Sequence, residues 1–150
     1  MDVVVRSLKR EDLEAALPIL VAGSLSAHGE DPKQLDAYWE AAQETRRRHG
    51  DVLVAEASGE VIGVCQVMIF PHFQHTGGLC CEIESVHVRS DRRSMGVGAL
   101  MLAHAEKMAR DSGCYRIQLT SRNVRVDAHR FYEANGFEWT SKGFKKSLLD

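Results

Sequence analysis

A glycine-containing loop between two regular segments has the clearest chemical use in this sequence. It reads Arg93-Ser94-Met95-Gly96-Val97-Gly98-Ala99 and leads into a stretch with helical spacing of apolar residues. Small residues at the start of a helix let backbone N–H groups approach an anion, and the helix dipole adds a favourable potential there. The loop therefore indicates a pyrophosphate site, with a simple tight turn from strand to helix as the alternative.

Two common nucleotide-binding motifs do not fit this loop. A P-loop requires Gly-Lys-Ser or Gly-Lys-Thr after its glycines, which this stretch lacks. A dinucleotide fingerprint requires a third glycine at the position where this chain has Met101. Both motifs are therefore excluded, and an anion bound here would belong to another kind of ligand.

The histidines and cysteines offer weaker candidates. His72 and His75 lie in a polar turn and could bind an anionic substrate, or a metal that bridges to one, although loop histidines are more often simply solvated. A zinc site that combines them with Cys80 or Cys81 is conceivable, but the spacing matches none of the common zinc frameworks. We therefore predict no metal and interpret the four cysteines as small apolar residues in a reducing compartment.

Apolar spacing in the first half of the chain predicts strands and two helices. In chain order these segments are a strand at Val3–Val5, a helix at Leu8–Leu25, a loop at Gly23–Pro32, a helix at Pro32–His49, a strand around Val52 and Val54, a strand at Val61–Phe70, a turn at Pro71–Gly78 and a strand at Leu79–Arg89. Pro18 lacks the backbone N–H that a helix interior requires, so we expect the first helix to kink or restart there. Alternation along the Leu79–Arg89 strand predicts that His87 lies on the opposite face from Glu82 and Glu84.

The second half of the chain is patterned for further helices and strands. The segments are a helix from Gly96 to Gly113, a strand around Ile117 and Leu119, a helix at Asp127–Ala134 and a final hairpin through Phe137 and Phe144. Hairpin-connected strands followed by alternating strands and helices predict a mixed α/β protein.

The composition fits one folded domain over residues 1–150. Hydrophobic residues make up 44% and charged residues 27% of the chain, as in ordinary globular proteins. The net charge of −2 does not favour nucleic acid or an anionic membrane as a partner. The longest apolar run, Val61–Phe70, is far shorter than the roughly 20 residues of a membrane span. The amino terminus lacks an export signal, so we expect a cytoplasmic protein.

Two motifs in this order resemble the GNAT acetyltransferase superfamily. They are Arg93-x-x-Gly96-x-Gly98 after a Val-rich strand and Phe131-Tyr132-Glu133-Ala134-Asn135-Gly136-Phe137 downstream. The segment from Gly77 to Leu148 is most similar to aminoalkylphosphonate and small-amine N-acetyltransferases, through Glu82-Ile83-Glu84, Asp127–Tyr132 and Gly143–Leu148. The stretch Gly113–Ile117 is also similar to amino-sugar-phosphate acetyltransferases.

The resemblance implies a fold and a cosubstrate. The fold is α/β, a single GNAT-type domain with a mixed, mostly antiparallel sheet of six to seven strands and about four flanking helices. The fourth and fifth strands would splay apart to admit acetyl-CoA. The implied acetyl-CoA contacts are Val86, His87 and Val88 on the fourth strand and the loop residues Arg93, Ser94, Met95, Gly96, Val97, Gly98 and Ala99. Arg125 stands where the family commonly has an asparagine, so either Asn123 takes over that contact through a longer loop or the contact is absent.

The resemblance also implies catalytic residues. A primary amine is mostly ammonium at neutral pH and must lose a proton before it attacks a thioester. Glu82 lies where the family's general base often stands, and Glu84 could replace it or bind the cation. Tyr132 matches the tyrosine that protonates the departing CoA thiolate or holds its sulfur. The alternatives are a solvated carboxylate pair and an aromatic packing residue.

We therefore predict an acetyl-CoA-dependent N-acetyltransferase that acts by direct attack in a ternary complex. The acceptor would be a primary amine of a small metabolite, such as an aminoalkylphosphonate, amino sugar or aminoglycoside-like amine, with a homodimer as an option for assembly. The loop at Ser24–Pro32 and the His-containing turn would frame the acceptor through Ser24, His28, His72 and His75. The alternatives are an acetyltransferase for protein amino termini or lysines, and a non-catalytic acyl-CoA sensor.

Overall fold

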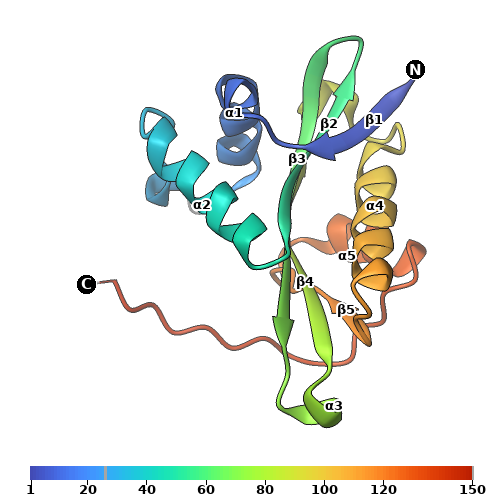
Figure 1. Cartoon of the computed structure of the whole chain (residues 1–150). Helices are drawn as coiled ribbons and strands as arrows, with labels where there is room; N and C mark the ends of the chain where they lie inside the picture. Colours follow the sequence, from blue (N-terminus) through green and yellow to red (C-terminus); the bar gives the residue numbers. More distant parts are fainter. Residues whose placement is uncertain (26, 150) are drawn as a thin grey trace. The chain divides into compact units, whose positions relative to one another are not determined.

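A computed structural model describes residues 1–25 and 27–149 of the chain. Contacts divide the chain into two compact units, Met1–Gln118 and Leu119–Asp150. Figure 1 shows the helices and strands of both. Within the described residues, no helix combines the length and the apolar character that a membrane span requires.

The first unit contains a five-stranded sheet in the described residues, with strand order β1-β2-β3-β4-β5. Its elements are β1 (Val3–Ser7), α1 (Leu13–Gly23), α2 (Leu35–Arg47), β2 (Asp51–Ala57), β3 (Glu60–Pro71), the one-turn helix α3 (Gln74–Gly77), β4 (Leu79–Val88), α4 (Val97–Asp111) and β5 (Arg116–Gln118). Neighbouring strands are antiparallel except β4 and β5, which are parallel. The predicted α/β class and the mixed, mostly antiparallel sheet are confirmed.

Helices cover both faces of this sheet, with α1 and α2 on one face and α4 on the other (Figure 1). Val54 and Val64 of the strands pack with Leu13 and Leu17 of α1 in one buried cluster. On the opposite face, β3 approaches α4 so closely that a Cβ on Gly63 would lie 3.2 Å from the sulfur of Met101. We call the side covered by α1 and α2 the α1/α2 face.

The two helices of the α1/α2 face differ in detail from the sequence prediction. Helix α1 continues through Pro18 without a restart. Four of its residues are buried against the rest of the unit, and this burial outweighs the backbone hydrogen bond that proline cannot make. Helix α2 begins at Leu35 rather than at Pro32, and it ends at Arg47.

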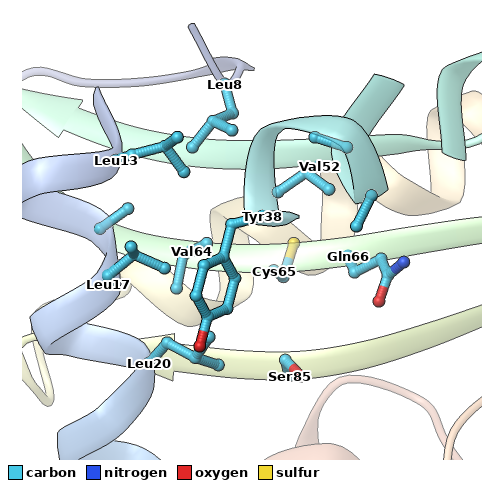
Figure 2. A pocket seen from close by; sticks show the side chains of 13 residues that line it. Leu8, Leu13, Leu17, Leu20, Tyr38, Val52, Val64, Cys65, Gln66 and Ser85 are labelled. Atoms are coloured by element: carbon cyan, nitrogen blue, oxygen red, sulfur yellow. The ribbon is translucent and has the colours of Figure 1, made fainter. Parts of the chain in front are cut away.

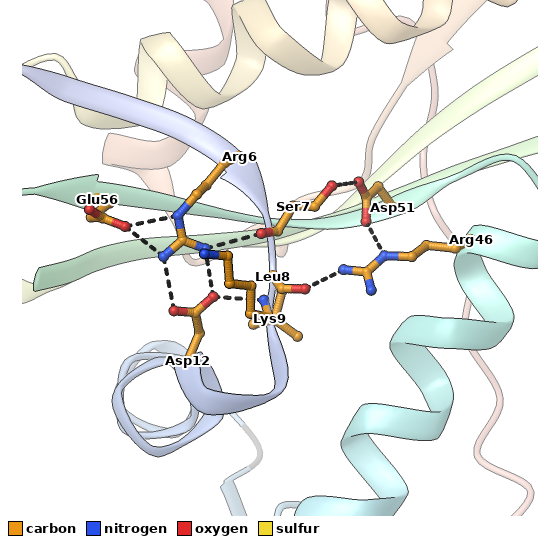
Figure 3. A network of polar contacts seen from close by, with 8 residues as sticks. All are labelled: Arg6, Ser7, Leu8, Lys9, Asp12, Arg46, Asp51 and Glu56. Carbon is orange, nitrogen blue, oxygen red and sulfur yellow. Dashed lines mark hydrogen bonds and ion pairs between the residues drawn. The ribbon is translucent and has the colours of Figure 1, made fainter. Parts of the chain in front are cut away.

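A network of ion pairs connects α1 and α2 to strands β1 and β2 at the edge of the sheet (Figure 3). Arg6 of β1 contacts the carboxylates of Asp12, just before α1, and of Glu56 on β2, each at 2.6 Å. Arg46 of α2 pairs with Asp51 at the start of β2, at 2.8 Å. The Asp12 side chain is only 8% exposed, so its charge depends on Arg6.

The second unit contains α5 (Val126–Ala134), followed by a chain without regular strands up to residue 149. The predicted hairpin through Phe137 and Phe144 is not formed, so the expectation of six to seven strands is wrong for the described residues. An isolated hairpin is marginally stable without a third strand or a helix to pack against. Phe144 is accordingly 91% exposed. The described helices α1–α5 number five rather than four, because α3 forms in the predicted turn.

Candidate active site

A β-bulge at Ser85 interrupts strand β4. Glu84 pairs with Gln66 of β3 and His87 pairs with Val64, so two residues of β4 stand opposite one residue of β3 between these pairs. Ser85 takes a positive φ of 55°, which is uncommon for a residue other than glycine. The extra residue shifts the alternation of every side chain that follows it.

The bulge brings Glu84 and His87 to the same face of the sheet. Directly opposite residues of an antiparallel pair project to one face. Val64 lies in the cluster with α1, and the Gln66 amide donates to the Thr45 hydroxyl of α2 at 3.1 Å, so both face α1 and α2. The prediction that His87 and Glu84 lie on opposite faces is therefore wrong, because simple alternation does not include the bulge.

His87 is seated against the end of α1. A Cβ added to Gly23, the last residue of α1, would lie 2.1 Å from the imidazole Nδ1 of His87. The absence of a side chain at Gly23 is therefore required by the close approach of this ring. The His87 side chain thus connects β4 to the point where the α1–α2 loop begins.

Glu82 lies at the last pair of the parallel β4–β5 ladder. It is opposite Gln118, whose side-chain amide donates to the Glu82 carboxylate with 2.5 Å between Nε2 and Oε2. Glu82 also pairs with Met68 of β3, two residues from the Glu84–Gln66 pair, so both carboxylates share one face, as predicted. That face is the α1/α2 face. No local pattern indicates Gln118, because its contact with Glu82 joins residues 36 positions apart.

Strand β4 continues to Val88 after its pairing with β5 has ended. Residues 83–88 have no partner in β5 in the part of the chain that the structure describes. Backbone groups there are candidates to bond an extended ligand, as predicted for Val86, His87 and Val88. The splaying of the two strands beyond Glu82 stays a prediction.

The glycine loop joins β4 to α4 as predicted. Gly96 is the residue before the 15-residue helix α4 and has a φ of 81°. A Cβ added there would meet no atom within 4 Å, so the backbone is open to an approaching ligand. The first N–H groups of a helix have no partner within the helix. This end of α4 therefore fits a diphosphate bound through the backbone of the Arg93–Ala99 loop.

Three arginines lie beside this loop, and two of them pair with carboxylates. Arg89 pairs with Asp91 at 2.7 Å, and Arg92 lies 3.9 Å from Glu60. Arg93 instead donates to the carbonyl oxygen of Val88 at 3.3 Å. Arg93 thereby lies against the backbone end of β4, where the loop begins.

The four predicted acceptor residues fall into two groups. His72 and His75 lie before β4 and contact Tyr115, since His72 Nδ1 pairs with the Tyr115 hydroxyl and the His75 ring stacks on its ring at 3.9 Å. Ser24 and His28 follow α1, whose end contacts His87. At about 3.3 Å per residue, these two groups are separated by most of the length of β4, about 25 Å.

Tyr132 belongs to the second unit and lies on α5. Its ring contacts Phe131 at 5.3 Å and Phe137 at 6.1 Å between centroids, the edge-to-face and tilted arrangements that aromatic rings prefer. Asn123 lies in the turn before α5. The proposed contacts of Tyr132 and Asn123 with acetyl-CoA stay predictions.

The described residues contain no cluster of side chains that would form the alternative zinc site. Within residues 1–25 and 27–149, no three His, Cys, Asp or Glu side chains are grouped so that they could hold a metal ion. Cys80 is fully buried, and burial raises the pKa of the Cys65 and Cys81 thiols to about 12. A zinc ion at Cys81 would have to displace a proton that burial holds on the thiol.

The residues that form the carboxylate pair, the bulged strand and the glycine loop all lie in a segment that matches a known protein family. A family model described as "Acetyltransferase (GNAT) family" matches residues 13–137. This chain belongs to the GNAT acetyltransferase family. GNAT acetyltransferases use acetyl-CoA, so the predicted family, enzyme class and cosubstrate are confirmed.

Curated GNAT relatives include two small-amine acetyltransferases. Aminoalkylphosphonate N-acetyltransferase of Salmonella typhimurium is 33% identical over 95 residues, which cover 63% of this chain and 61% of that protein. Glucosamine 6-phosphate N-acetyltransferase of Trypanosoma brucei brucei is 29% identical over 140 residues, which cover 91% of this chain and 90% of that protein. The predicted likeness to small-amine acetyltransferases is confirmed.

A solved structure also shares the GNAT fold of this chain. It is described as a transcriptional regulator from Bacillus halodurans C-125 and has a TM-score of 0.90 at 30% identity. The superposition covers 98% of this chain and 100% of that one. The fold of this chain is therefore similar to that of a solved structure.

Proposed function

We propose that this chain transfers the acetyl group of acetyl-CoA to a primary amine of a small metabolite. The observation that carries the proposal is the pair of carboxylates, Glu82 and Glu84, on one face of β4 where its pairing with β5 ends. The named activities of the two curated relatives suggest aminoalkylphosphonates and amino sugars as acceptors to assay first, with aminoglycoside-like amines beside them.

Acetyl-CoA would be held by backbone groups of the first unit. The open backbone at Gly96 and the first N–H groups of α4 suit its diphosphate. Val86, His87 and Val88, beyond the end of β5, would bond the pantetheine arm. Asn123 would supply a further contact from the second unit.

The chemistry would be a direct transfer. Glu82 would accept a proton from the ammonium group, directly or through one water, so that the neutral amine attacks the thioester carbonyl. The new C–N bond forms as the C–S bond breaks, and Tyr132 would donate a proton to the departing thiolate. The second proton, which the acetylated nitrogen loses, would return to the Tyr132 phenolate. Glu84 would hold the ammonium or replace Glu82 as base. Gln118 would orient Glu82 through its amide N–H.

We place the acceptor at the α1–α2 loop, near Ser24 and His28, rather than at His72 and His75. Gly23 at the start of that loop touches His87, three residues after Glu84, whereas His72 and His75 contact Tyr115 before β5. The α1–α2 loop thus reaches β4 beside Glu84, in the stretch without a β5 partner where acetyl-CoA would bind. The cytoplasmic location and the homodimer stay predictions.

An assay of CoA release over a panel of amines tests this function. The panel contains aminoalkylphosphonates, amino sugars, polyamines, aminoglycosides and amino acids, with peptides bearing a free amino terminus or a lysine as the comparison. We expect release with small amines to exceed release with peptides. Turnover of peptides alone would support a protein acetyltransferase, and tight acyl-CoA binding without any turnover would support a sensor.

A further inference from the structure

An apolar pocket lies on the α1/α2 face between α1, α2 and strands β2–β4 (Figure 2). Its volume is about 130 Å³, and aliphatic side chains such as Leu13, Leu17, Val52 and Val64 form most of its wall. Among the described residues that line it, none is charged. An apolar cavity of about 150 Å³ is known to accept benzene, so this pocket suits a compact apolar group.

The pocket reaches the bulge of β4. Its polar lining residues are Tyr38, Gln66 and Ser85. Ser85 follows Glu84 directly, and Gln66 is the β3 partner of Glu84. Figure 2 shows the Tyr38 hydroxyl on the same side of the pocket as Leu20 and Ser85. One wall of the apolar pocket is therefore adjacent to the carboxylate pair.

The α1–α2 loop supplies another carboxylate on the Tyr38 side. The Tyr38 hydroxyl donates to Glu30 at 2.5 Å and accepts from the Asp31 backbone N–H at 3.1 Å. Burial and then the bond to Glu30 raise the pKa of Tyr38, so its hydroxyl remains a donor at neutral pH. Glu30 is thereby fixed beside an uncharged pocket, and its negative charge complements an ammonium group.

We infer that the acceptor is a primary amine with a compact, uncharged apolar body that occupies this pocket and points its ammonium toward Glu84 and Glu30. The inference rests on the proposed function and specifies its substrate class. Burial of the apolar body is favourable, whereas a phosphate or phosphonate would be desolvated there without a cation among the described lining residues.

Acceptor preference of the full chain tests the inference. CoA release is measured with 2-phenylethylamine and n-butylamine, and with 2-aminoethylphosphonate and glucosamine 6-phosphate as polar acceptors. We expect kcat/KM to be at least about tenfold higher for 2-phenylethylamine than for either polar acceptor. A preference for a polar acceptor would overturn the inference and leave the proposed function standing. Turnover of no amine would instead contradict the proposed function.

A matched pair of variants tests whether the preference for 2-phenylethylamine arises in the pocket. Ala42 of α2 lines the pocket, and Ala109 of α4 is equally enclosed but on the opposite face. Ala42→Val should raise KM for 2-phenylethylamine by about tenfold and KM for methylamine by less than about twofold. Ala109→Val should change neither KM. An equal change in KM for 2-phenylethylamine in the two variants would contradict the pocket assignment.

A binding measurement shows whether an amine occupies the pocket even if a variant does not fold or no amine is turned over. Methyl NMR of the wild-type chain is recorded during titration with 2-phenylethylamine. We expect shifts of the Leu17 and Val64 methyl signals, with the Ala109 methyl signal unchanged. If a saturating concentration of 2-phenylethylamine shifts neither the Leu17 nor the Val64 methyl signals, the pocket is excluded as the binding site.

Discussion

The side-chain amide of Gln118 on β5 donates a hydrogen bond to the carboxylate of Glu82 on β4. The two residues form the last pair of the parallel β4–β5 ladder. An amide orients a carboxylate without a charge of its own, whereas an arginine or lysine partner would compete with an incoming ammonium group. The pair therefore orients the carboxylate through a contact that contains no cation.

Gln118→Met should lower kcat by about tenfold, because loss of a hydrogen bond to a charged group is worth about 1.5 kcal/mol. The variant keeps a side chain of similar length, so acetyl-CoA affinity should not change. Steady-state kinetics and calorimetry measure both quantities. Gln43→Met removes an amide from α2 and is the control. Equal kcat in the two variants would show that Gln118 does not position the base.

Gly96→Val should weaken acetyl-CoA binding by more than about tenfold, because a side chain there blocks the approach of a ligand to the backbone. The φ of 81° also strains any L side chain, so a control with similar strain is needed. Gly113 at the other end of α4 has a φ of 77° and is equally open. Calorimetry that shows equal losses in Gly96→Val and Gly113→Val would attribute the effect to strain.

Tyr132→Phe should reduce kcat on the order of 10²-fold, because only the phenolic proton donor is removed. The ring contacts with Phe131 and Phe137 remain, so the melting temperature should be unchanged. Tyr115→Phe, which removes the hydroxyl beside His72, is the control. Full kcat of Tyr132→Phe across the pH range would assign Tyr132 to packing alone.

Asp12→Asn should lower the free energy of unfolding by about 2 kcal/mol at pH 7, because it breaks an ion pair whose carboxylate is largely buried. The hydrogen bond from Arg6 holds the pKa of Asp12 below its ordinary value of 3.8. The folded state therefore binds this proton less readily than the unfolded chain, so the pair stabilises fully above about pH 4 and less as the pH falls further.

Urea unfolding at pH 7 and pH 3 measures this difference. The gap between the wild type and Asp12→Asn should narrow at pH 3. Asp36→Asn is the control, because Asp36 pairs with Arg10 while 89% exposed, and its loss should cost less than about 0.5 kcal/mol. A gap that stays constant between the two pH values would contradict the role of the Asp12 charge.

Local sequence patterns were sufficient for most of the elements. The glycine loop and α4 were predicted because small residues precede an apolar repeat within one continuous segment. The shared face of Glu82 and Glu84 was predicted because both precede the bulge. These features depend on spacing between residues close in sequence.

Features that depend on pairing between distant segments were not predicted. The bulge at Ser85 is decided by the register of β4 against β3, and it moves His87 to the α1/α2 face. The contact between Gln118 and Glu82 follows from a parallel register that no local pattern contains. The passage of α1 through Pro18 depends on burial against other elements.

The pH dependence of Glu82→Gln with a preferred amine tests the central claim most directly. The substitution keeps the shape and removes the base, so kcat/KM at neutral pH should fall by about 10²-fold or more. The loss should shrink toward pH 10, where the amine loses its proton unaided. Glu84→Gln, measured beside it, identifies which carboxylate acts. Glu82→Gln with the rate and pH profile of the wild type would contradict the account.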